Sequence, residues 1–295
     1  MNIIETVRDT AGHTQRFVIA AALSLVVLAA QTPDASAAED EKSLLWMDNS
    51  YSVLYGTGFE IDPEDQWDPL LLEHVSGWSW GDLYTFVEYT RFLNTTGDNN
   101  TTSWYGEFSP RLSFGKILGK DMSFRIFDQS ILVWKDVLFA MTYERGRISD
   151  QTESLLLGVG FDMDLSVFGV YGRGFDHFQL NIYARNELNS GAGDDPERGF
   201  KDLQITVVAA YPLEIGRAKF LIDGFIDFVA GFGPQARNFH FSPQIKLDIG
   251  NFWGKPGVFY AGVDIDYWTN KYGRQDSDAF DTDQLAVSFL VKYHF

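Results

Sequence analysis

The sequence contains no cysteine, so disulfide bonds and thiolate metal sites are excluded. Positive charge is also scarce: 23 Lys and Arg residues stand against 41 Asp and Glu residues, for a formal net charge of -18. The acids are spread along the chain, and nucleic-acid binding is not expected, because it requires a basic face. The sequence has no H-E-x-x-H pair, no EF-hand calcium loop and no phosphate-binding loop. These absences predict a protein without a metal or a cofactor.

Long apolar runs are missing, with one exception near the N-terminus at residues 17–30. Arg8 and Arg16 precede this run, and the triplet Ala35-Ser36-Ala37 follows it and fits the small-x-small rule for signal-peptide cleavage. The run is short for a membrane-crossing helix, which disfavours the alternative of an N-terminal anchor. We therefore predict that residues 1–37 are a signal peptide, that the protein is exported, and that residues 38–295 form one domain.

Helical periodicity of useful length is missing from the rest of the chain, and alternation of period two takes its place. The alternation is clearest at the C-terminus, where every second residue is apolar: Leu285, Val287, Phe289, Val291, Tyr293 and Phe295. The chain ends on an aromatic residue, which is typical of the closing strand of a transmembrane barrel. A buried closing strand in a soluble β-sandwich is the alternative.

About twelve such segments follow one another, each roughly ten residues long, which is the length of a tilted strand that crosses a bilayer. They are 45–61, 68–75, 82–93, 104–114, 131–144, 154–165, 178–188, 202–213, 219–230, 239–249, 258–271 and 283–295. Pro110 within one of them predicts a bulge or a strand end. Aromatic residues make up 16% of the chain, as two membrane-interface girdles require. The predicted fold is all-β: a transmembrane antiparallel up-and-down β-barrel in the outer membrane of a Gram-negative cell.

The alternation also predicts which side chains face the interior of the barrel. Charges on the lipid face would cost several kcal/mol, so charged positions are assigned to the lumen. We predict that the inward aromatic residues Tyr84, Phe86, Tyr260 and Trp268 stack a flat solute and that Glu88, Asp264 and Asp266 accept its hydrogen bonds. Arg111, Lys246 and Lys292 are predicted to balance the acids of the lumen. The alternatives are that the aromatic side chains only fill a narrow barrel and that each acid only neutralises a nearby cation.

Several stretches resemble a known family when taken in order: Glu107–Phe114, Leu157–Asp164, Gln179–Arg185, Gly224–Phe228, Asp264–Trp268 and Leu290–Phe295. They are similar to the nucleoside-specific outer-membrane channels of the Tsx type. The resemblance implies a monomeric barrel of about twelve strands whose narrow lumen carries nucleosides and deoxynucleosides. It also implies that phages or bacteriocins use the outer loops as a receptor. The ending at Phe295 resembles the signal that the barrel-insertion machinery reads.

Three functions fit a barrel of this kind. The first is selective, passive uptake of nucleosides or similar small solutes, which needs no chemistry. The second is an outer-membrane lipid or peptide hydrolase, which needs a nucleophile beside a base; His74, His177, His240 and His294 fall in no such constellation. The third is a structural or adhesion barrel with a plugged lumen. Acidic outer loops would suit bridging to lipopolysaccharide through divalent ions in every case. We predict the channel, with no catalytic residues.

Overall fold

The computed structural model describes residues 43–93, 101–127, 131–148, 150–165, 174–189, 199–233, 235–278 and 280–295. The predicted signal peptide and most of the loop that follows Leu93 lie outside the described residues. Among the described residues, no helix is long and apolar enough to cross a membrane.

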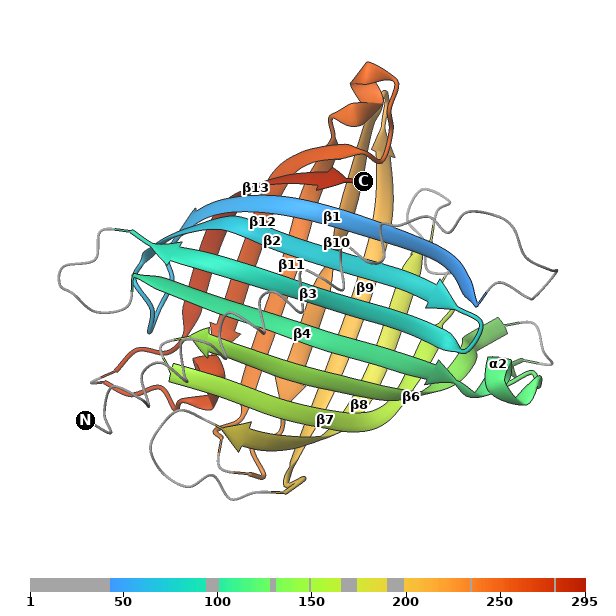
Figure 1. Ribbon diagram of the computed structural model, residues 1–295, viewed down its shortest axis with the longest axis horizontal. Coiled ribbons are helices and arrows are strands. Elements are labelled where there is room, and N and C mark those ends of the chain that lie inside the picture. Colours follow the sequence, from blue (N-terminus) through green and yellow to red (C-terminus); the bar gives the residue numbers. More distant parts are fainter. Residues whose placement is uncertain are drawn as a thin grey trace, which may run out of the picture. The chain divides into compact units, whose positions relative to one another are not determined.

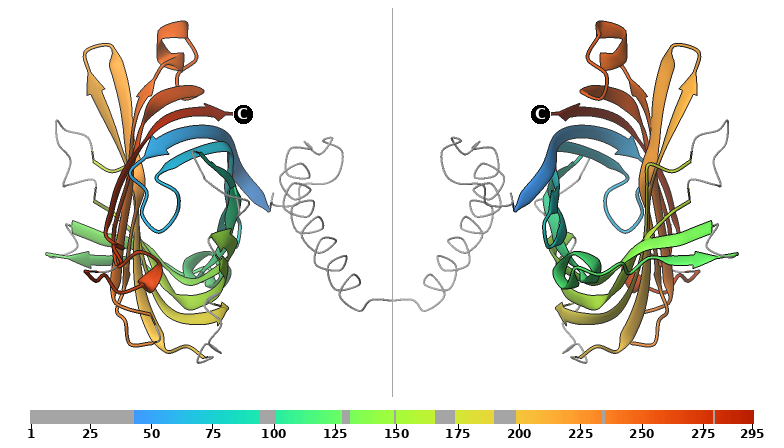
Figure 2. Two further views of the ribbon diagram at one scale, coloured as in Figure 1. Left: turned by 90° about the vertical axis from the view of Figure 1, so that its left-hand side faces the viewer. Right: turned by 90° about the vertical axis from the view of Figure 1, so that its right-hand side faces the viewer.

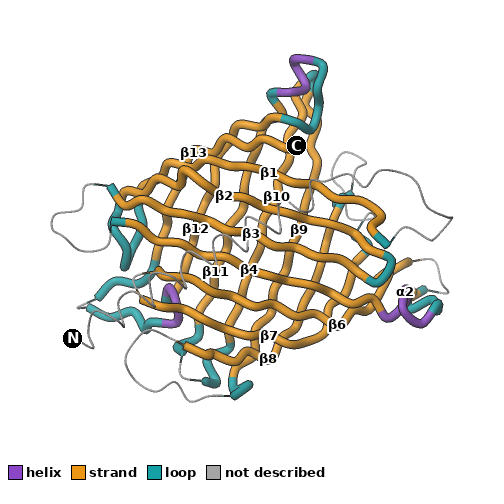
Figure 3. The backbone as a smooth tube through the Cα atoms, viewed as in Figure 1, coloured by secondary structure: helices purple, strands orange, loops and turns teal. Residues whose placement is uncertain are grey.

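Twelve antiparallel strands form a closed β-barrel, as predicted (Figures 1 and 3). The strands are β1 Leu44–Thr57, β2 Asp65–Trp78, β3 Gly81–Phe92, β4 Thr102–Ser113, β6 Ile131–Ile148, β7 Asp150–Met163, β8 His177–Asn189, β9 Asp202–Ile215, β10 Ala218–Val229, β11 Asn238–Asp248, β12 Phe259–Thr269 and β13 Gln284–His294. Sequential strands pair along the sheet, and the pairing of β1 with β13 joins the two ends of the chain. Since β4 pairs with β6, the ring has no free edge there.

Each predicted segment coincides with one strand of the ring, and the prediction of the barrel is confirmed. The prediction of a bulge or strand end at Pro110 is wrong. The strand β4 continues to Ser113, and its register with β6 is the same on both sides of the proline, at Phe108↔Tyr143 and Arg111↔Ala140. A proline removes only one backbone donor, and the neighbouring pairs hold the ladder in place on either side.

The burial of β13 shows the two faces of the barrel wall. Its inward residues are buried: Gln284, Ala286, Ser288, Leu290 and Lys292. Its outward residues are exposed, apart from the half-buried Val291, with Leu285 at 64%, Phe289 at 57% and Tyr293 at 46%. Apolar side chains on the outside and polar ones on the inside are the arrangement that a bilayer requires of a barrel.

The barrel has two ends, which we call the terminal end and the far end. The terminal end holds the start of β1, the C-terminus and the connections 79–80, 114–130, 164–176, 216–217 and 249–258. The connection 114–130 contains the short helix α2 (Phe114–Leu118) and the strand β5 (Phe124–Ile126), which pairs with β6. The 3-10 helix η2 (Gly250–Trp253) lies in 249–258.

The far end holds the connections 58–64, 93–101, 190–201, 230–237 and 270–283, and residue 149 between β6 and β7. The connection 270–283 begins with the 3-10 helix η3 (Lys271–Gly273). Figure 2 shows the connection 58–64, in blue, turned in across the opening of the barrel at this end.

Candidate functional site

The interior of the barrel is lined by charged side chains that meet in ion pairs. Near the terminal end, Arg111 on β4 is nearly fully buried, and its Nε and Nη2 donate to the Asp82 carboxylate at 2.9 and 2.6 Å. Its Nη2 also donates to Asp162 on β7 at 2.8 Å. One cation thus joins three strands, and its charge is balanced locally.

Two lysines on the opposite part of the wall are paired in the same way. Lys246 on β11 lies 2.7 Å from Asp223 on β10, and Lys292 on β13 lies 2.6 Å from Glu73 on β2. Lys246 is only 1% exposed. Both side chains are held against their own acids and do not extend freely into the passage.

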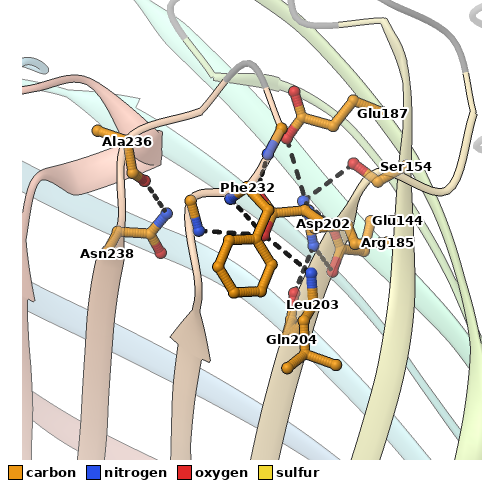
Figure 4. Close-up of polar contacts among 12 residues, drawn as sticks. Glu144, Ser154, Arg185, Glu187, Asp202, Leu203, Gln204, Phe232, Ala236 and Asn238 are labelled. Carbon is orange, nitrogen blue, oxygen red and sulfur yellow. Dashed lines mark hydrogen bonds and ion pairs between the residues drawn. The ribbon is translucent and has the colours of Figure 1, made fainter.

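A larger cluster surrounds Arg185 on β8, toward the far end (Figure 4). Its guanidinium donates to both oxygens of Glu144, at 3.0 and 2.7 Å, to Gln204 at 2.7 Å and to Ser154 at 3.0 Å. Glu187 lies 3.6 Å from its Nε. All of these side chains are buried, so the cluster fixes four neighbouring strands to one another by hydrogen-bonded charge.

Asp202 at the start of β9 fixes the adjacent connection at the far end (Figure 4). Its two carboxylate oxygens accept hydrogen bonds from the backbone N–H groups of residues 231–233, at 3.0 to 3.2 Å. The side-chain amide of Asn238 donates to the carbonyl of Ala236 at 3.1 Å. These bonds satisfy backbone groups that the strands no longer pair.

Aromatic rings and carboxylates alternate across β3 and β4 on the inner wall. Phe86 is paired in register with Glu107, and Glu88 with Tyr105. The ring of Phe86 lies between those of Tyr84 and Tyr105, with centroid distances of 5.8 and 5.7 Å. The Tyr105 hydroxyl donates to Glu107 at 3.0 Å. We call these five residues the aromatic–acid panel.

Apolar side chains lie next to this panel. Leu54, Leu71 and Leu290 form a buried cluster, and Phe86 packs against it. They come from β1, β2 and β13, which are neighbours in the ring. The panel therefore has a rigid apolar support on one side.

Trp268 on β12 forms a second aromatic site, toward the far end. Its ring stacks on His240, with a centroid distance of 3.7 Å and an interplanar angle of 16°. The Nε2 of His240 is 2.6 Å from the Asp266 carboxylate, which also accepts from Gln284 at 2.7 Å. Tyr260 lies at the terminal end of β12 instead, where its ring meets His294 at 5.5 Å.

Glu88 of the panel belongs to a group of four acids, with Asp68 on β2 and Asp264 and Asp266 on β12. Glu88 interacts electrostatically with the other three. Asp264 is hydrogen-bonded to Gln244, and Asp68 to Thr90. Within the described part of the chain, no Lys or Arg forms an ion pair with any of the four, and no three His, Asp or Glu residues have an arrangement that could hold a metal ion.

The structure brings some of the predicted site residues together and separates others. Tyr84, Phe86 and Glu88 share the panel, whereas Trp268 and Tyr260 lie at different heights of the wall. Arg111, Lys246 and Lys292 each form an ion pair with an acid other than Glu88, Asp264 and Asp266. Lys246 also acts electrostatically on Asp264. Alternation assigns a residue to a face, but the tilt and stagger of the strands decide its height.

Lys271, in η3, forms a set of buried contacts that the sequence does not indicate. It is 2% exposed, and its Nζ donates to the Gln284 side chain at 2.6 Å and to the carbonyl of Glu60 at 2.9 Å, across 211 residues of sequence. Asp62 lies 3.4 Å away and accepts from the Tyr272 hydroxyl at 3.0 Å. Burial lowers the pKa of Lys271. These bonds tie the connection 58–64 to 270–283.

One protein family and several known proteins are similar to this chain. A family model described as nucleoside-specific channel-forming protein, Tsx, matches residues 48–295. Outer membrane protein OmpK of Vibrio parahaemolyticus is 23% identical over 283 residues, which cover 93% of this chain and 96% of OmpK. Among solved structures, the KdgM porin matches with a TM-score of 0.42 and 10% identity over 83% of this chain and 99% of its own. OpdK of Pseudomonas aeruginosa matches with a TM-score of 0.27 and 9% identity, over 84% and 98%.

Proposed function

The chain belongs to the family of nucleoside-specific channel-forming proteins of the Tsx type, and we propose that its own solutes are nucleosides or small molecules of similar shape. Membership of this family makes the protein an outer-membrane channel for small solutes and not an enzyme. No bond is made or broken in such a passage. The wall has to attract the solute enough to favour entry and weakly enough to allow release.

The aromatic–acid panel is the observation that supports this solute class. A nucleoside has a flat base and a hydroxylated sugar. The rings of Tyr84, Phe86 and Tyr105 offer faces for stacking, and base–aromatic stacking contributes about 1–3 kcal/mol per base. The carboxylates of Glu88 and Glu107 lie beside these rings and would accept hydrogen bonds from sugar hydroxyls or base amino groups.

The rest of the path would extend this contact along the lumen. We propose that Trp268 stacks the base a second time, that Tyr260 lines the exit at the terminal end, and that Asp264 and Asp266 accept from the solute between the two. Arg111, Lys246 and Lys292 fix the acids that they pair with and so shape the wall. Several weak sites in series permit faster passage than one tight site.

We propose that the terminal end faces the periplasm, because an even number of strands places both chain ends there in bacterial outer-membrane barrels. Residues 1–37 would then be the signal peptide removed during export. Phe295, which is 56% exposed and stacks on Tyr293, would be read by the barrel-insertion machinery. The far end would meet lipopolysaccharide through divalent ions and serve as a receptor for phages or bacteriocins. The protein would act as a monomer.

Block of single-channel current tests the proposed solute class. The refolded protein is placed in a planar bilayer, and uridine, ribose and glycine are added at matched concentrations. We expect a small, steady conductance that uridine alone reduces. Equal effects of the three solutes would contradict nucleoside selectivity, and a complete lack of conductance would point to a plugged barrel.

A matched pair of variants tests the panel. Tyr84 faces the lumen and is 36% exposed, whereas Tyr267 faces outward and is 38% exposed. Loss of one stacking face should weaken uridine block in Tyr84→Ala by roughly 5- to 150-fold. Tyr267→Ala should leave uridine block unchanged. If uridine blocked both variants and the wild type equally, the panel would not contact the solute.

A further inference from the structure

Two connections at the terminal end lie side by side, 216–217 between β9 and β10 and 249–258 between β11 and β12. The side-chain amide of Asn251 donates to the carbonyl of Arg217 at 3.0 Å and joins them. Figure 1 shows 249–258, in orange, projecting beyond the marked C-terminus. We call the exposed side chains of these two connections, Arg217, Phe252, Trp253 and Lys255, the projecting surface.

The aromatic side chains of this surface lie on the lipid side of the wall. Trp253 is 67% exposed and Phe252 50%. The Trp253 ring stacks on Phe259, with a centroid distance of 5.6 Å. Phe259 stands opposite Tyr293 in register, and Tyr293 is an outward residue of β13, so Phe259 faces outward too. An exposed tryptophan at the end of an outward face is typical of the boundary between lipid chains and headgroups.

The charged side chains of this surface are both cations. The two connections contain no Asp or Glu, although the whole chain carries a net charge of -18. Arg217 and Lys255 are exposed, and neither forms an ion pair with an acid of the described part of the chain. Asp248, which precedes η2, accepts from two backbone N–H groups of 249–258, at 2.9 and 2.8 Å. Positive charge therefore remains beside the exposed aromatic rings.

We propose that the projecting surface binds the headgroup of an anionic phospholipid, with phosphatidylglycerol as the model ligand. Arg217 and Lys255 contact the phosphate, and Phe252 and Trp253 lie against the upper part of the lipid chains. Cations next to a bilayer attract anionic lipids, and a guanidinium can donate two parallel hydrogen bonds to a phosphate. The inference requires only that the barrel lies in a membrane, and it holds whichever solute the channel carries.

Quenching of Trp253 by brominated lipids measures this preference. The full-length barrel is reconstituted in vesicles of phosphatidylglycerol and phosphatidylcholine, with bromine on the chains of one lipid at a time. The contribution of Trp253 is the fluorescence that Trp253→Phe removes. We expect phosphatidylglycerol to be preferred at Trp253 by about 5- to 30-fold, a factor of about five for each cation near the surface. Arg217→Gln combined with Lys255→Gln should bring the preference to about one.

Lys120→Gln combined with Arg125→Gln is the matched control. Both residues are exposed in the connection 114–130 at the same end of the barrel, where Asp121 interacts electrostatically with Arg125. The control removes the same two charges and should keep the wild-type preference. An equal loss in the two double variants would overturn the inference, because it would reflect only the net charge of the protein. Quenching of wild-type Trp253 in proportion to the share of each lipid, or no quenching by either, would also overturn it.

Discussion

Arg185 is nearly fully buried and charged, which is tolerable only because Glu144, Glu187, Gln204 and Ser154 surround it. Breaking a buried ion pair from one side costs more than the pair contributes, because the remaining charge has no partner. The lumen depends on several such pairs. The buried cations of the lumen therefore act as supports of the wall.

Replacing Arg185 by Met should lower the free energy of unfolding by about 3–5 kcal/mol, since it leaves two buried acids without a cation. The measurement is reversible urea unfolding in lipid vesicles, followed by tryptophan fluorescence. The control is Arg145→Met, because Arg145 is 44% exposed and lies 4.0 Å from its acid. A pair of that kind contributes at most about 1 kcal/mol. Similar losses in the two variants would show that the cluster is not a structural support.

For single residues, the sequence predicts which face of the barrel wall a side chain lies on, but not its height along the barrel. Alternation places Tyr84, Tyr260 and Trp268 inside, as the structure does. Height along the barrel depends on register and strand tilt, which follow from pairing and not from the pattern within one strand. The ion-pair partners of Arg111, Lys246 and Lys292 therefore could not be predicted from the alternation within each strand. The role of the ten predicted residues in solute contact stays a prediction.

Among the elements, the strands can be predicted from the sequence, because each one alternates apolar residues that face lipid with polar residues that face the lumen. The helix and strand in the connection between β4 and β6 cannot be predicted in this way. The helix α2 spans only Phe114–Leu118 and β5 only Phe124–Ile126, which is too short for either period to show. The bonds between 58–64 and 270–283 also could not be predicted, because Lys271 and Glu60 lie 211 residues apart in the sequence and only the pairing of β1 with β13 brings the two connections together.

Lys271→Met should release the connection 58–64 from the far end of the barrel. Each lost hydrogen bond to a charged group is worth about 1.5–3 kcal/mol, which is enough to raise an open state of this connection more than about tenfold. We expect a larger and noisier single-channel conductance. Lys255→Met, at the exposed connection of the terminal end, should keep the wild-type conductance. An unchanged conductance in Lys271→Met would mean that 58–64 does not narrow the mouth.

At the scale of the whole molecule, composition and fold explain each other. The net charge is -18, and charged side chains are destabilising on an outer wall that contacts lipid. Many of the acids lie on the inner wall, where they form ion pairs with lysine and arginine side chains and make the interior polar. The family, the closed ring of twelve strands and this interior together define an outer-membrane channel.

Uptake of labelled uridine into vesicles that contain the purified protein tests the central claim most directly. A selective channel with weak sites should give uptake that saturates with uridine concentration, that adenosine inhibits by competition and that ribose leaves unchanged. Tyr84→Ala should shift the saturation to higher concentration, whereas Tyr267→Ala should not. Uptake that rises in proportion to concentration and is indifferent to adenosine would contradict the account, because it would describe an unselective pore.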